Sequence, residues 1–132
     1  MPWKPKLAAA DRARSTREHG LRAERLVALW LQRRGYDIVA TNLRLGHLEI
    51  DIVARQGPVI VIVEVRTRGE GAWTTPFGSV DPAKRTRLRR AGERLWQRRY
   101  KHDPSVERMR FDVASVKFSD GKAHIEHAVA AF

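Results

Sequence analysis

The stretch "LEIDIVARQGPVIVIVEVRTR", Leu48–Arg68, decides the fold of this chain. Two runs rich in β-branched residues flank the turn signal "RQGP", so the stretch predicts two adjacent strands, at about 47–54 and 59–67. The run "VIVIVEV" has no polar face before Glu64, which is typical of a central strand covered on both sides. We therefore expect the second strand to lie in the middle of a sheet.

Four charged residues interrupt these two strands. Residues two apart on a strand face the same side, so Glu49 accompanies Asp51 and Glu64 accompanies Arg66. Buried charges are costly unless they are paired or bind a metal. Clustered carboxylates are the oxygen ligands that a hard divalent cation requires, so the pattern predicts an Mg²⁺ or Mn²⁺ site. The alternative is a cross-strand ion pair of Glu49 with Arg66, while Asp51 faces solvent.

The region before these strands predicts a helix that begins near Ser15 and ends before Gly35. Ser15 and Glu18 have the spacing of a capping box. Residues 1–14 combine prolines, alanines and scattered charges without periodicity, so we expect a flexible N-terminal tail there. We expect residues 15–132 to form a single domain.

The apolar face of this helix includes Val27 and Leu31, and Glu24 falls in the middle of it. A helix packed over the charged strands would bring Glu24 into the carboxylate group. The other elements expected from the sequence are strands at about 37–44, 109–118 and 122–129 and a helix at about 82–101. The predicted class is therefore α/β, in the order α-β-β-β-α-β-β.

The composition points to a polyanionic partner. The chain has 132 residues, a net charge of +11, a pI near 11.2 and no cysteine. A charge this positive favours nucleic acid. A membrane surface is disfavoured because the apolar stripes are committed to a core and no segment approaches the length needed to cross a bilayer. The absence of cysteine agrees with a reducing, cytoplasmic setting, where we expect the protein.

The second helix carries most of this charge. Between Pro82 and Lys101 there are nine Lys or Arg residues and one acid, Glu93. On the side opposite the apolar stripe, helical spacing gathers a cationic face of Arg87, Arg90, Arg94, Arg98 and Lys101. The face is either an ordinary solvated surface or a nucleic-acid interface. Like charges at i, i+4 repel unless an anion is present, which favours the interface.

Two aromatic residues, Trp73 and Phe77, lie in the Gly-rich loop that follows the charged strand. They either stack on an unpaired base or wedge open a junction, or they pack on the core or at a dimer contact. The sequence leaves both roles open.

The motif "Asp51…Glu64-Val65-Arg66" resembles the Asp…(Asp/Glu)-x-Lys motif of restriction-endonuclease-like nucleases. The segments "GLRAE", "LEIDIVA", "VIVEVRTR", "VDPAKRTRLRRA" and "RFDVASV" resemble, in order and spacing, the YraN-like family of uncharacterised bacterial proteins. The resemblance covers nearly the whole chain after residue 19. It implies a restriction-endonuclease-like core, with a central mixed sheet flanked by helices.

The resemblance also implies roles for individual residues. Asp51 and Glu64 match the metal-binding acids, and Arg66 occupies the position of the catalytic lysine. Glu24 matches the helix-one acid of archaeal Holliday-junction resolvases, and Glu49 is the first acid of the family's Glu-Ile-Asp signature. An arginine is too weak an acid to serve as a general base for water, so the metal would have to activate the water alone.

We therefore expect an endonuclease, dependent on Mg²⁺ or Mn²⁺, that acts on structured or branched DNA. Resolvase-like function favours a two-fold homodimer that presents two sites to a two-fold junction. One alternative is a nucleic-acid-binding module that keeps the nuclease fold without turnover. Another is an RNA-binding accessory protein.

Overall fold

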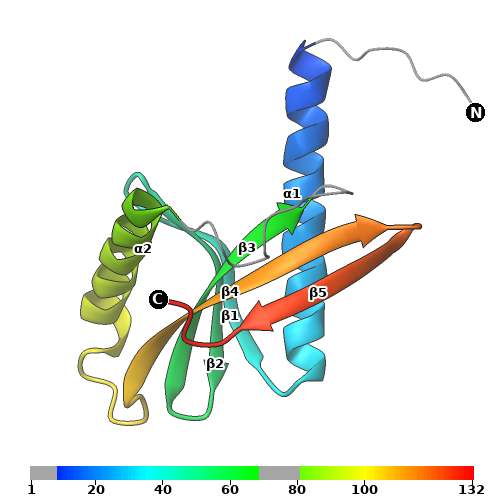
Figure 1. Ribbon diagram of the computed structural model, residues 1–132. Coiled ribbons are helices and arrows are strands. Elements are labelled where there is room, and N and C mark those ends of the chain that lie inside the picture. The colour runs from blue at the N-terminus through cyan, green and yellow to red at the C-terminus, as the bar shows by residue number, and fades with distance from the viewer. Residues whose placement is uncertain (1–8, 69–80) are drawn as a thin grey trace, which may run out of the picture.

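The computed structural model describes residues 9–68 and 81–132, in which a five-stranded sheet lies between two helices (Figure 1). The elements in chain order are α1 (Ala9–Arg33), β1 (Asp37–Leu45), β2 (Leu48–Gln56), β3 (Val59–Arg68), α2 (Pro82–Leu95), a one-turn π-helix η1 (Trp96–Tyr100), β4 (Arg108–Ser119) and β5 (Lys122–Ala128). This is the predicted α-β-β-β-α-β-β order, and the α/β fold class is confirmed.

The sheet is mixed, with its strands in the order β1-β2-β3-β4-β5. β1–β2, β2–β3 and β4–β5 are antiparallel, whereas β3 and β4 are parallel, from Val59 opposite Arg108 to Arg68 opposite Lys117. A parallel pair needs a crossover connection, which α2 provides. β3 lies in the middle of the sheet and its residues 59–63 are buried, as the sequence predicted.

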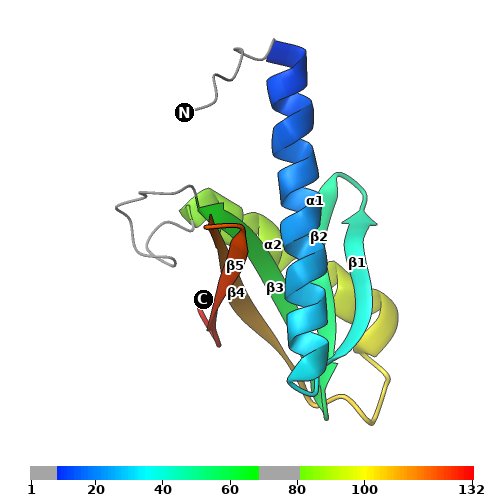
Figure 2. The same ribbon diagram turned by 90° about the vertical axis from the view of Figure 1, so that its right-hand side faces the viewer.

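Each helix covers one face of the sheet, as Figure 2 shows with α1 in front and α2 behind. The core under α1 contains Ala23, Val27, Leu31, Ile52, Val61, Val63 and Ala114, among others. The core under α2 contains Ile50, Val53, Ile60, Ile62, Ala91 and Leu95, among others. Alternate residues of β3 therefore enter opposite cores. Among the described residues no helix is long and apolar enough to span a membrane.

The first helix is longer than the sequence predicted. α1 begins at Ala9 rather than near Ser15, because Ala9 and Ala10 are strong helix formers that extend it. Residues 9–14, which the sequence assigned to a tail, are therefore helical, and this first part of α1 projects beyond the sheet (Figure 1). Trp73 and Phe77 lie outside the described residues.

A buried acid on β4, Asp112, is fully satisfied. Its carboxylate accepts hydrogen bonds from Arg110 at 2.8 and 2.9 Å and from the Ala130 backbone N–H at 2.9 Å, and it lies 2.7 Å from His127 Nε2. Burial opposes its ionisation, but the hydrogen bonds from His127, Arg110 and Ala130 outweigh burial and hold its pKa below the usual range. Asp112 is therefore a structural anion that ties the end of the chain to the sheet.

Candidate active site

The candidate site forms where β2 and β3 separate. Their ladder ends at the pair Ile52–Val63, and Asp51 and Glu64 occupy the next opposing positions. Asp51 Oδ2 accepts a hydrogen bond from the Val65 backbone N–H at 2.9 Å, so a side chain replaces the backbone partner that the ladder no longer supplies. Asp51 is half-buried in this fork rather than on a solvent-facing surface.

The opposing acid, Glu64, has a cationic partner on α2. Its side chain is only 4% exposed, and its Oε1 lies 2.5 Å from the Nζ of Lys84. Local sequence places this lysine: Asp81 caps the helix by accepting from the Ala83 N–H at 3.0 Å, and Pro82 occupies the first helical turn. The Asp-Pro start of α2 thus fixes where Lys84 meets β3.

A third carboxylate, Glu24, reaches the fork from α1. It is half-buried beside the core residues Ala23 and Val27, and it hydrogen-bonds to Asn42 on β1. Asn42 has a left-handed backbone (φ 50°), a conformation that asparagine tolerates better than most residues. Within the described part of the chain, Glu24 Oε2 is the one buried side-chain nitrogen or oxygen without a hydrogen-bond partner. A buried oxygen without a partner is costly, so Glu24 Oε2 is a candidate ligand atom.

The pKa values of two of these acids, Glu24 and Asp51, are raised. Burial, followed by the charge of Asp51, raises the pKa of Glu24 from 4.5 to about 7. Burial and the charge of Glu64 raise the pKa of Asp51, while the Val65 N–H and Lys84 partly offset the rise. Carboxylates with raised pKa values in a cleft are a feature that functional sites share with structural ion-pair networks.

Two depressions flank the fork, and Asp51 lines one of them. On the α2 side, a cavity of about 290 Å³ is lined by His47, Leu48, Glu49, Asp51, Glu64, Lys84, Arg87 and Leu88. On the α1 side, Glu24 and Asn42 line a depression of about 520 Å³. The predicted carboxylates therefore meet at the fork but do not share one cavity. Glu49 is exposed at the rim of the first, and its ladder partner is Arg44 on β1.

Arg66, in the position of the nuclease lysine, lies on β3 opposite Ser115 of β4. It follows Glu64 by two residues and so shares its side of the strand. The β2–β3 ladder ends before the position at which Glu49 would lie opposite Arg66. The alternative of a cross-strand ion pair between Glu49 and Arg66 therefore has no ladder pair to support it. The side chain of Arg66 is half-buried.

The predicted cationic face divides into parts. Arg87 lines the carboxylate cavity, whereas Arg90, Arg94 and Arg98 line a separate depression further along α2. Arg94 also donates from Nη1 to the Leu45 carbonyl oxygen at 3.1 Å, so it fastens α2 to β1. Lys101 is exposed just beyond η1. All five cations are on the surface, and Arg94 additionally has a structural contact.

Sequence reasoning missed Lys84 and Asn42 as members of the site. Lys84 was counted only as one of the nine cations of the helix. The sequence did contain a signal for Lys84. A lysine in the first turn of a helix is unfavourable next to the positive end of the helix dipole, which indicates a nearby anion. Asn42 carried no comparable signal, since its left-handed backbone and its contact with Glu24 are visible only in the folded chain.

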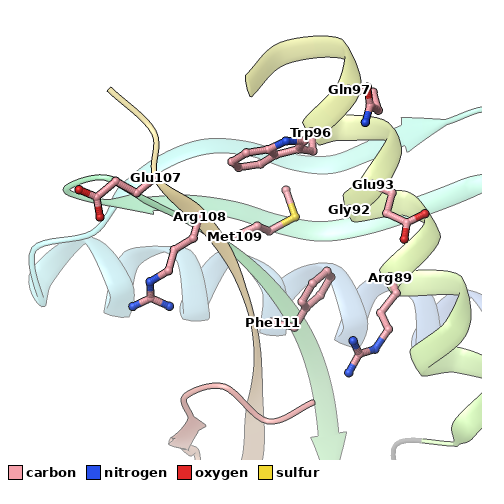
Figure 3. Close-up of a pocket in the computed structure, with 9 residues that line it drawn as sticks. All are labelled: Arg89, Gly92, Glu93, Trp96, Gln97, Glu107, Arg108, Met109 and Phe111. Atoms are coloured by element: carbon pink, nitrogen blue, oxygen red, sulfur yellow. The ribbon is translucent and has the colours of Figure 1, made fainter. Parts of the chain in front are cut away.

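A different cavity, of about 330 Å³, lies between α2 and the start of β4 and shares no lining residue with the carboxylate cavity. In Figure 3, Met109 and Phe111 of β4 lie beside Gly92 of α2, with the Trp96 ring near them. A Cβ on Gly92 would lie 2.7 Å from Phe111 Cζ, so only glycine permits this approach. The cavity is mainly apolar and holds no cluster of acids.

The donor set at the fork suits a divalent cation by its chemistry. Its carboxylate oxygens are hard donors, and buried Glu24 Oε2 has no other partner. Among the described residues, however, no three Asp, Glu or His side chains are arranged around one point as a preformed metal site. Lys84 holds an oxygen of Glu64, and the Val65 N–H holds an oxygen of Asp51. A cation would therefore bind with a rearrangement of side chains.

Comparison with known proteins identifies a family whose model spans the fork. The model of the uncharacterised protein family UPF0102 matches residues 23–116, a range that includes every carboxylate of the site. A UPF0102 protein of Sorangium cellulosum is 52% identical over 126 residues, which cover 95% of this chain and 88% of that protein. UPF0102 proteins of Anaeromyxobacter dehalogenans (41% identical; 86% and 82% covered) and Syntrophomonas wolfei (34%; 88% and 98%) are also similar.

Proposed function

The chain belongs to the uncharacterised protein family UPF0102, and from its carboxylate fork we propose that it is a divalent-metal-dependent endonuclease acting on structured or branched DNA. One observation carries the proposal. Acids from three different elements, Glu24, Asp51 and Glu64, converge at the separation of two strands, and cations of α2 border them. Phosphodiester hydrolysis needs this combination of oxygen ligands for a metal and cations for phosphate.

In this proposal each residue has a distinct task. Asp51 and Glu64 hold the metal through carboxylate oxygens, and Glu24 and Glu49 complete the oxygen-rich surroundings. A cation held there would supply the activation of water and the neutralisation of negative charge on the phosphate. The Arg66 guanidinium contacts the scissile phosphate.

The proposed DNA contact is the cationic face of α2. Arg87 borders the carboxylate cavity, and Arg90 and Arg98 continue the surface away from it. The face runs from Arg87 on α2 to Lys101 just beyond η1, so it can follow several phosphates. Phosphate contacts carry affinity without sequence information, so recognition by DNA shape is the expected mode.

The direct test of the activity is a panel of labelled substrates: a four-way junction, a flap, a duplex and a single strand. Each is incubated with wild-type protein in Mg²⁺, Mn²⁺ or EDTA. We expect cleavage that requires the metal and is abolished in Asp51→Asn and Glu64→Gln. Both variants should still bind DNA at least as tightly as wild type, because each removes negative charge near phosphate. Cleavage that persists in EDTA or in both variants would exclude this site.

A second candidate function is a DNA-binding module without turnover. Two differences from the nuclease motif favour it. Arg66 stands in the position of the catalytic lysine, and the Lys84 ammonium group is paired with a carboxylate oxygen of Glu64. The same panel separates the candidates. If wild type binds the junction but cuts no substrate with either metal, the binding module is the correct account.

Arg66→Lys gives a second discrimination. It restores the lysine of the nuclease motif, so activity should survive or rise. Arg66→Ala should lose most activity, because it leaves the phosphate charge unneutralised. Equal activity in all three proteins would remove Arg66 from the catalytic machinery.

A further inference from the structure

Lys84 is the closest cation to the candidate site that the motif comparison does not assign. Its Nζ lies 2.5 Å from Glu64 Oε1, so the pair is a direct charge-assisted hydrogen bond. The two partners differ in exposure: the Glu64 side chain is 4% exposed and the Lys84 side chain 42%. The carboxylate is fixed in the sheet, and the lysine is the partner that can leave.

The position of Lys84 on α2 has no structural advantage for the helix itself. The first turn contains no acidic residue, and Lys84 and Arg85 both place positive charge at the positive end of the helix dipole. Such charges destabilise a helix unless an anion lies near them. The N-cap carboxylate of Asp81 and the carboxylate of Glu64 are the anions near this end of α2, and a phosphate would supply another.

From these contacts we propose that Lys84 is an internal counter-ion of Glu64, which a divalent cation displaces and which then binds the phosphate of the nucleic acid. The inference rests on the proposed function, because it assumes that Glu64 is a metal ligand. A metal and an ammonium group cannot both occupy the same carboxylate oxygen, so binding of one requires release of the other. The four-carbon stem of lysine allows that release without movement of α2.

The surroundings explain where the released ammonium goes. Lys84 and Arg87 lie one helical turn apart, and both line the cavity that contains Asp51 and Glu64. The cavity is about 290 Å³ and open to solvent through exposed residues such as His47 and Glu49. Once displaced, Nζ remains in a cavity with a second cation, and together they make a phosphate site at the start of α2. Lys84 would thus supply from the helix the cation that the motif usually places on the strand.

The test measures Mn²⁺ affinity by titration calorimetry in wild type, Lys84→Met and Lys84→Arg. Methionine keeps the stem but removes the competing charge, so Lys84→Met should bind Mn²⁺ about tenfold more tightly, the factor that corresponds to about 1.4 kcal/mol. Arginine keeps the ion pair, so Lys84→Arg should bind no more tightly than wild type. Lys122→Met, an exposed charge on β5, controls for the change in net charge.

A second measurement keeps the inference testable if Lys84→Met is poorly folded. Without added metal, Lys84→Met should melt at a lower temperature than wild type because buried Glu64 loses its partner. Saturating Mn²⁺ should remove that difference, and affinity for labelled DNA in Mn²⁺ should fall. The inference is wrong if wild type binds Mn²⁺ and Lys84→Met binds it equally or more weakly. If wild type binds no Mn²⁺ at all, the proposed metal function itself fails.

Discussion

The half-buried carboxylate of Glu24 leads to a prediction about how the free energy of unfolding changes with pH. Glu24→Gln removes a negative charge from beside Asp51 and leaves an amide that can donate a hydrogen bond to it. The rise of the Glu24 pKa from 4.5 to about 7 corresponds to at most about 3 kcal/mol of destabilisation above pH 7. Solvent screening of a half-buried side chain reduces this to about 1–2 kcal/mol.

The sign of the pH dependence follows from linkage. An acid with a raised pKa in the folded state binds its proton more tightly there than in the unfolded chain. Below about pH 4.5, Glu24 is protonated in both the folded and the unfolded chain, so it does not lower the free energy of unfolding. As the pH rises from 4.5 towards 7, the unfolded chain ionises first and the folded state loses stability, until the full cost is reached above about pH 7.

Urea denaturation at pH 5 and pH 8 measures the effect. We expect Glu24→Gln to raise the free energy of unfolding at pH 8 by about 1–2 kcal/mol and to change it little at pH 5. Glu18→Gln, on an exposed position of the same helix, is the matched control and should show no such difference. Equal stabilities of Glu24→Gln and wild type at both values of pH, or a loss of stability at pH 8, would refute the reasoning.

Further predictions concern packing and the basic surface. Gly92→Ala should lower the free energy of unfolding by about 1–3 kcal/mol, because the new methyl group overlaps β4, whereas Gly20→Ala, with nothing within 4 Å of its Cβ, should stabilise α1. Asp112→Asn should cost about 3–5 kcal/mol in urea denaturation, since it removes the anion of a buried network. Arg94→Gln should lower stability by about 1 kcal/mol more than Arg98→Gln, because only Arg94 bonds the β1 carbonyl.

The DNA-binding surface is tested by salt dependence. Contacts to roughly four to six phosphates predict a log–log slope of about −4 to −5 on duplex DNA. The triple change to glutamine of Arg87, Arg90 and Arg98 should flatten that slope. The control changes three exposed cations outside α2 to glutamine: Arg25, Arg33 and Lys122. An unchanged slope in the first variant, or an equal loss in the control, would remove α2 from the interface.

The strands and their order were predictable from the sequence because their signals are local. The "RQGP" turn and the alternation of β-branched residues determine the β2–β3 hairpin, and an apolar run without a polar face determines the central strand. The half-buried position of Glu24 was predictable for the same reason, because a carboxylate in the middle of an apolar helix face is visible in the helical period alone.

The rest of the site depends on distances that no local pattern contains. The contact of Lys84 with Glu64 requires the crossover of α2 onto the face of β3, and the bond of Arg94 to Leu45 requires the turn between β1 and β2 to approach that helix. Helical periodicity placed Lys84 and Arg94 on α2, but it could not show that each of them contacts another part of the sheet. The point where the β2–β3 ladder ends, at the pair Ile52–Val63 next to Asp51, likewise has no signal in the local sequence.

The central claim, that the carboxylate fork binds a divalent cation, is tested most directly by Mn²⁺ titration calorimetry at pH 8. Wild type, Asp51→Asn and Glu64→Gln are compared with Glu107→Gln, which changes an exposed acid outside the site. The account predicts Mn²⁺ binding in wild type and Glu107→Gln, and loss or strong weakening in Asp51→Asn and Glu64→Gln. Equal Mn²⁺ affinity in all four proteins, or no binding in wild type, would contradict it.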